Sequence, residues 1–214
     1  LHYADLYADL VDPLAPRIDA PVRALVESDD AEYAPIGNVG VQLYLRTDRD
    51  APNRKVVAVD TRAPDPANWR IVVPEQTQAL ENVALIGGRI AAQYLVDVNS
   101  RLRLFRLDGT PQEQIALPGV GSVFGLSGRQ DTSDVWYAFS SPLMPTTVFR
   151  YDPATRHSTA FEPPEAPIDA SRYETTAGFA TSRDGTRVPF FMTARKGVRR
   201  DGSNPVMLYG YGGF

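Results

Sequence analysis

The sequence predicts an all-β fold made of consecutive blades of a β-propeller. Apolar and polar residues alternate with a period of two over short segments that are rich in β-branched and aromatic residues, as expected for strands of about five to eight residues. Four such strands close with an aspartate, at intervals of 55, 48 and 44 residues. Units of ~40–50 residues with several short strands are typical of propeller blades, which bury their faces against their neighbours. A β-sandwich with irregular hairpins is the alternative that this pattern allows.

Strands and turns alternate along the first 160 residues, and about three blades with the tail of a fourth are expected there. The turn segments are rich in Gly, Asn, Asp and Pro, which tolerate positive φ or fix φ. No long amphipathic helix is expected before residue 170. The clearest strands are residues 41–46, 55–60, 101–108 and 134–139, and the clearest turns are residues 36–38, 50–53, 86–88, 97–100 and 108–110.

The aspartates that close the repeated strands are Asp5, Asp60, Asp108 and Asp152. A carboxylate at the end of a strand can accept hydrogen bonds from the amides of the turn that follows. We therefore expect these residues to form turns rather than to bind a ligand.

A proline-rich segment divides the chain. Residues 161–167 contain three prolines within five positions, which excludes a helix or a central strand and indicates a linker. After it, residues 173–180 and 187–194 are expected to form a hairpin, and Pro189 places its second strand toward a sheet edge or at a bulge. Residues 206–208 are then expected to form a buried strand.

The composition is that of an ordinary globular chain, with 214 residues, 43% hydrophobic residues and a net charge of −4. There is no apolar run of the ~20 residues that a membrane-spanning helix needs and no basic patch for nucleic acid, so we expect a soluble monomer of the cytoplasm or the periplasm. The absence of cysteine excludes disulfides and thiolate metal sites and fits a bacterial protein. His2 and His157 are expected to be strand residues rather than metal or catalytic residues.

The glycine-rich segment at the end of the sequence carries the strongest functional signal. Gly210, Gly212 and Gly213 allow the backbone to pass close to a ligand, which would then meet Tyr211 and Phe214 directly. A structural turn with two buried aromatic rings is the alternative. Because both ends of the chain fall within strand-like sequence, we expect an internal piece of a larger protein.

Several segments together form a pattern that is typical of one family. They are residues 182–189, 196–197, 201–202, 205 and 208–214, and upstream residues 120–123, 125, 127–128, 140–142 and 168–173. In these segments the chain resembles prolyl oligopeptidases, a family of serine peptidases. The resemblance implies a seven-bladed propeller joined to an α/β-hydrolase domain, with residues 1–166 as the second half of the propeller and residues 167–214 as the first strands of the hydrolase.

The resemblance also implies roles for two residues. Tyr211 matches the tyrosine whose hydroxyl stabilises the oxyanion of the tetrahedral intermediate, and Phe214 matches the aromatic ring that packs against the substrate proline in the S1 pocket. A phenol suits the first role because it stays protonated at neutral pH. The expected substrates are short proline-containing peptides cut after proline, with no metal or organic cofactor.

The catalytic serine is expected beyond this segment. The sequence has no Gly-x-Ser-x-Gly motif, since Gly125-Leu126-Ser127-Gly128 has the wrong spacing. In α/β-hydrolases the triad follows the first strands, so the segment alone should be inactive. Two alternatives stay open: an oligopeptidase B-like enzyme that cuts after basic residues, against which Phe214 argues, and a propeller binding module on a non-catalytic domain.

Overall fold

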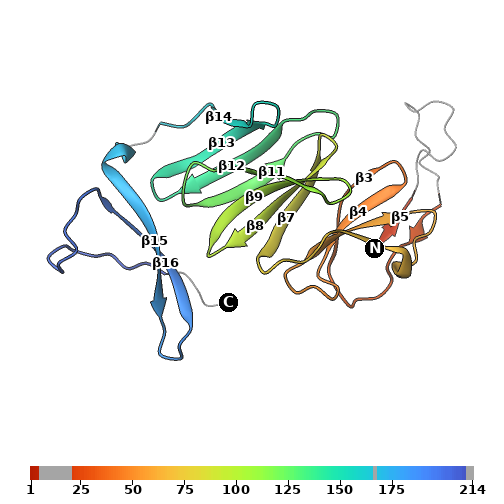
Figure 1. Cartoon of the computed structure of the whole chain (residues 1–214), viewed down its shortest axis with the longest axis horizontal. Coiled ribbons are helices and arrows are strands. Elements are labelled where there is room, and N and C mark those ends of the chain that lie inside the picture. The colour runs from red at the N-terminus through yellow and green to blue at the C-terminus, as the bar shows by residue number, and fades with distance from the viewer. Residues whose placement is uncertain (5–20, 166–167, 211–214) are drawn as a thin grey trace.

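The computed structural model describes residues 1–4, 21–165 and 168–210, and these residues form three four-stranded antiparallel sheets and two smaller ones (Figure 1). Each large sheet takes four consecutive strands. The first contains β3 (Tyr33–Val39), β4 (Gln42–Thr47), β5 (Lys55–Asp60) and β6 (Arg70–Val73). The second contains β7 (Ala79–Ile86), β8 (Arg89–Val96), β9 (Asn99–Arg106) and β10 (Pro111–Ile115). The third contains β11 (Ser122–Ser127), β12 (Val135–Ser141), β13 (Met144–Asp152) and β14 (His157–Phe161).

The remaining elements are short. β1 (His2–Tyr3) pairs with β2 (Arg23–Ala24), and β15 (Tyr173–Thr181) pairs with β16 (Arg187–Arg195). The only helices in the described part of the chain are two three-residue 3₁₀ turns, η1 (Pro66–Asn68) and η2 (Ala170–Arg172), so the all-β prediction is confirmed there. The predicted hairpin is confirmed as β15–β16, each strand of which starts at the predicted residue and ends one residue later than predicted. Pro189 lies on an edge strand, because β16 pairs with β15 alone among the described strands.

The aspartate repeat marks equivalent places in the three large sheets. β5 ends at Asp60, β13 ends at Asp152, and Asp108 lies two residues after the end of β9, so each aspartate follows or closes the third strand of its sheet. The Oδ1 atoms of Asp60, Asp108 and Asp152 accept hydrogen bonds from the backbone amides two residues later, at 2.9, 2.8 and 2.8 Å. The prediction that they form turns is therefore confirmed, whereas Asp5 lies outside the described residues.

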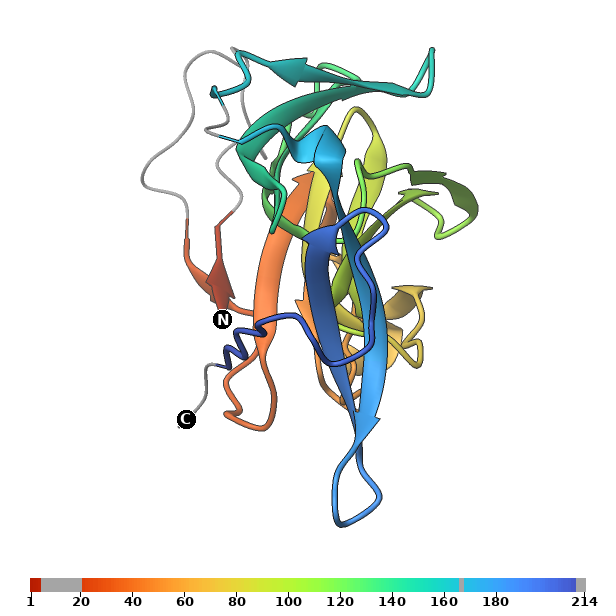
Figure 2. The same cartoon turned by 90° about the vertical axis from the view of Figure 1, so that its left-hand side faces the viewer.

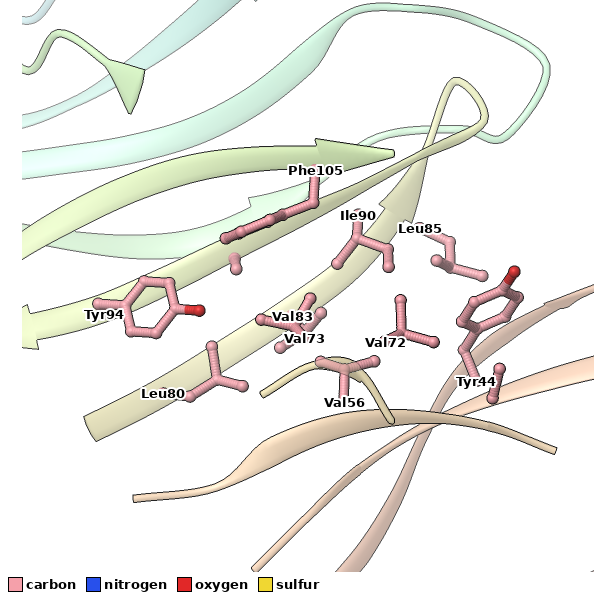
Figure 3. Close-up of a cluster of buried hydrophobic side chains, with 12 residues drawn as sticks. Tyr44, Val56, Val72, Val73, Leu80, Val83, Leu85, Ile90, Tyr94 and Phe105 are labelled. Atoms are coloured by element: carbon pink, nitrogen blue, oxygen red, sulfur yellow. The ribbon is translucent and has the colours of Figure 1, made fainter. Parts of the chain in front are cut away.

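Three separate sheets exclude the β-sandwich alternative. Successive sheets pack face to face, and the sheets in the middle of the series bury both faces. In β5, Val56 and Ala58 belong to the core between the first and second sheets, whereas Val57 and Val59 face the core shared with β1 and β2. Burial on both sides explains why this strand is almost continuously apolar. Figure 3 shows the core between the first two sheets, where Tyr44 and Val72 meet Leu85 and Ile90.

The first strands of the three sheets lie next to one another, since β7 contacts both β3 and β11. Each of these strands has an irregular register with the second strand of its own sheet. In β3 the shift falls between Pro35 and Gly37, and Gly37 has a φ of 136°. The predicted turn at residues 36–38 is therefore wrong, because the glycine forms a bulge inside a strand instead of ending it.

Gly109 sets the closest approach between the first two sheets. It has a φ of 93° in the turn that follows β9, and a Cβ placed on it would lie 1.8 Å from the carbonyl oxygen of Val72. Any side chain at this position would force β6 away from the second sheet. The fold therefore requires glycine here for both its conformation and its size.

We expect Gly109→Ala to lower the free energy of unfolding by about 3 kcal/mol, because the methyl group clashes with backbone and the residue must keep a positive φ. Gly185→Ala is the matched control: its φ is 85°, but a Cβ there meets nothing within 4 Å. The control should lose only about 1 kcal/mol. Urea unfolding of both variants measures the difference, and equal losses would show that the sheets do not approach so closely at Gly109.

Candidate functional site

The two predicted site residues, Tyr211 and Phe214, lie outside the described residues. The segment that leads to them is described as far as Gly210 and has no regular secondary structure after Asn204. Val206, Met207 and Leu208 are 87%, 89% and 94% exposed, so the predicted buried strand at residues 206–208 is not present here. A buried strand needs a hydrogen-bonding neighbour and a covering layer, and no described strand pairs with this segment.

The hairpin β15–β16 has apolar side chains on both faces. Its register places Phe179 opposite Pro189 on one face and Gly178 opposite Phe190 on the other. The ring of Phe190 covers Gly178, since a Cβ on that glycine would lie 2.7 Å from the ring. Phe179, Phe190 and Val188 are 42%, 44% and 46% exposed, and β15 and β16 pair only with each other among the described strands. Figure 2 looks onto the outer side of this hairpin, where no described strand lies in front of it. Two apolar faces are typical of a strand pair inside a larger, covered sheet.

The histidines and the serine considered in the sequence do not come together as a site. His2 lies in β1 and His157 at the start of β14, both exposed, and Ser127 lies at the end of β11. Within the described ranges there is no group of three or more His, Cys, Asp or Glu residues placed to hold a metal ion. In the same ranges, no helix is long and apolar enough to cross a bilayer.

A charged cluster joins the first sheet to the second. Glu32 accepts hydrogen bonds from Arg46 Nη2 at 2.5 Å and from Arg54 Nε at 3.1 Å. The same two guanidinium groups donate to the backbone carbonyls of Glu81 and Leu80 in β7, where the register of that strand shifts. Glu32 thus fixes two arginines of the first sheet on the irregular part of the neighbouring strand. The hydrogen bond from Arg46 is the main cause that lowers the pKa of Glu32, and Arg54 adds to it against the opposing effect of burial.

Uncharged polar groups join the second sheet to the third. The buried amide of Gln93 donates to the carbonyl oxygen of Val123 at 3.1 Å, and the amide of Val123 donates to Ser100 Oγ at 2.9 Å. Ser100 also donates its backbone N–H to the carbonyl of Gly121. Both polar groups of Val123 are therefore held by side chains of the neighbouring sheet. These bonds fix the position of β11 along the second sheet, which apolar packing alone does not do.

Sequence reasoning missed these contacts between sheets. The partners of Arg46 lie 14 and 35 residues away, and Gln93 lies 30 residues from Val123. None of them forms a motif with fixed spacing. A polar residue at an inward position of an otherwise apolar strand is the only signal, and Gln93 in β8 carries it.

We expect Glu32→Gln to lower the free energy of unfolding at pH 7 by roughly 1–2 kcal/mol, since the cluster is partly exposed and screened. Because the folded-state pKa of Glu32 is lowered, its contribution is present above the unfolded-state pKa and is lost as pH falls through the folded-state value. The gap between wild type and variant should therefore close in acid.

Denaturant unfolding from pH 7 to pH 3 measures this gap. Asp131→Asn is the control, because Asp131 pairs with Arg129 in the open, with side chains 63% and 76% exposed, and its loss should leave stability nearly unchanged. A gap for Glu32→Gln that stays constant over this pH range would contradict the assigned ion pair.

The chain belongs to the prolyl oligopeptidase N-terminal β-propeller domain family, whose model matches residues 1–164. It is 34% identical to the prolyl endopeptidase of Elizabethkingia meningoseptica over 175 residues, which are 82% of this chain and 25% of that protein. It is 32% identical to prolyl oligopeptidase ophP of Omphalotus olearius over 195 residues, again 25% of the relative. The chain thus spans about a quarter of the length of these curated relatives.

Solved structures agree with this family assignment. A structure from a mechanistic study of two prolyl endopeptidases aligns with a TM-score of 0.80 and 34% identity. The alignment covers 93% of this chain and 29% of the solved chain. The structure of prolyl oligopeptidase B from Galerina marginata, bound to a 35mer hydrolysis and macrocyclization substrate, aligns with a TM-score of 0.78 and 27% identity. This alignment covers 94% of this chain and 29% of the solved chain. The three large sheets are therefore part of a β-propeller, and the resemblance to prolyl oligopeptidases is confirmed.

Proposed function

We propose that the protein to which this chain belongs is a serine peptidase that cuts short peptides on the C-terminal side of proline. The observation that carries the proposal is the family match over residues 1–164, together with a prolyl endopeptidase that is 34% identical. Because these residues contain no Gly-x-Ser-x-Gly motif, the nucleophile is proposed to lie in another part of the protein.

Residues 1–166 are proposed as propeller and residues 167–214 as the start of an α/β-hydrolase domain. The two apolar faces of β15–β16 and the exposed apolar residues 206–208 support this division, since strands of a hydrolase sheet are covered on both sides. A propeller next to the active site would leave only a narrow route to it. We therefore propose that the propeller admits short peptides and excludes folded proteins.

The activity is tested by assaying the full-length protein on matched peptide amides that carry proline or arginine before the cleaved bond. Cleavage after proline that stops when a serine-directed phosphonylating reagent is added would support the proposal. Preferred cleavage after arginine would instead support the oligopeptidase B-like alternative, and no cleavage of either peptide would support a binding module.

Tyr211 is proposed to donate its hydroxyl to the oxyanion of the tetrahedral intermediate. The glycines on both sides of it leave the backbone free to aim the phenol at the substrate. A hydroxyl donor of this kind acts mainly in the transition state, because only there does the substrate carbonyl become an oxyanion. Phe214 is proposed to pack its ring against the substrate proline, which has no charge or donor to be recognised.

We expect Tyr211→Phe in the full-length enzyme to lower kcat by roughly 10²–10³ on an amide substrate while KM changes little. Phe214→Ala is the companion variant, and it should mainly weaken the preference for proline over other residues. Steady-state kinetics on both variants, with circular dichroism to show that they are folded, separate the two roles. A folded Tyr211→Phe enzyme with nearly wild-type kcat would contradict the oxyanion role and support the alternative that this segment is only a structural turn.

A further inference from the structure

A groove of about 280 Å³ runs beside the outer edge of the second sheet. It is lined by residues of β9 and β10 and by one residue from the connection between β6 and β7. We call it the Arg103 groove, and its residues are Gln76, Arg103, Leu104, Phe105, Pro111, Gln112, Glu113 and Gln114. Its volume is slightly below the ~300–1,000 Å³ of small-molecule pockets, so it suits the end of a chain better than a whole ligand.

The guanidinium of Arg103 is held in place by an uncharged amide and an aromatic ring, and no described carboxylate pairs with it. Its Nη1 donates to Gln76 Oε1, and its Cζ lies 4.9 Å from the centroid of the buried Tyr94 ring. Gln76 in turn donates its amide to the Tyr94 hydroxyl at 3.3 Å. Within the described part of the chain, the arginines paired with carboxylates are Arg46, Arg49, Arg54, Arg62, Arg129, Arg150 and Arg156, and Arg103 is not among them.

The acid that lines the groove does not neutralise Arg103. Glu113 Oε2 lies 3.0 Å from Arg156 Nε, and its side chain is only 17% exposed. In the β9–β10 ladder, Arg103 is opposite Gln114, whereas Glu113 is opposite Leu104. Since side chains alternate between the two faces of a sheet, Arg103 and Glu113 point to opposite faces. Glu113 is therefore not placed to pair with Arg103.

We propose that the Arg103 groove binds the C-terminal carboxylate of a peptide. A guanidinium presents five N–H donors. The contact with Gln76 uses only Nη1 of Arg103, so the other nitrogens can donate to a carboxylate. The exposed Pro111 gives the groove an apolar contact for the last side chain of the peptide, and the exposed Gln112 and Gln114 can pair with its backbone. The binding does not depend on the proposed function, which adds only that cleavage would release peptides with such an end.

The test is isothermal titration of the full-length protein with N-acetyl-alanyl-leucine and with its C-terminal amide. Neither peptide contains proline, so binding is measured apart from prolyl peptidase activity. Wild type should bind the acid and not the amide. Arg103→Gln should weaken binding of the acid by about ten-fold or more, the range expected for a lost charge-assisted hydrogen bond. Arg106→Gln is the matched control, an exposed arginine of the same strand outside the groove, and it should bind like wild type.

A second variant decides the outcome if Arg103→Gln fails to fold. Gln76→Glu keeps the side chain that positions Arg103 but gives the guanidinium an internal carboxylate, so it should also weaken binding of the acid about ten-fold or more. Equal binding of acid and amide, wild-type binding by a folded Arg103→Gln or Gln76→Glu protein, or no binding by wild type up to the solubility of the peptide would each overturn the proposal.

Discussion

Burial of both faces of a sheet against its neighbours is the constraint on which the rest of the structure depends. A four-stranded sheet that packs on only one side can leave polar residues on the other, but the second sheet here has no such side. Ile90 and Ala92 face the first sheet, while Ala91 faces the third. The strands β5 and β8 are therefore apolar over most of their length. The same constraint requires glycine where a turn of one sheet touches the backbone of the next, as Gly109 does at Val72.

Polar contacts then fix how the sheets are placed along one another. Apolar packing is not directional, whereas the hydrogen bonds from Arg46 to the carbonyl of Glu81 and from Gln93 to the carbonyl of Val123 each specify one position. Both bonds end on the first strand of the following sheet. The array can therefore act as a stable support for whatever lies beside it, and the hairpin β15–β16 leaves apolar side chains exposed on both of its faces.

The local features of this fold could be predicted from the sequence, because local chemistry determines them. The strand at residues 55–60, the hairpin turn at residues 182–186 and the turn-forming role of Asp60 depend on residues a few positions away. Gly37 misled the prediction because a glycine next to Asn38 is typical of a turn, and only the partner strand reveals a bulge. The exposure of residues 206–208 could not be predicted either, since the apolar character of a segment does not show which strands cover it.

The candidate site was predictable only through resemblance. Spacing alone allows the segment around Tyr211 to be a structural turn, and the family match now makes its catalytic role worth testing. Neither the spacing of residues in the sequence nor the family resemblance could predict the contacts between sheets. Glu32, Arg46 and Glu81 meet because the sheets stack, and no local pattern records which residues of one sheet face the next.

Native-state hydrogen exchange of the full-length protein, followed by mass spectrometry in low concentrations of urea, tests the central claim most directly. If each sheet is stable only because its neighbours cover it, the amides of β5, β8 and β12 should share one opening free energy and one dependence on urea. Opening of one of these strands at a much lower free energy than the other two would contradict the account, because that sheet would then be stable without its neighbours.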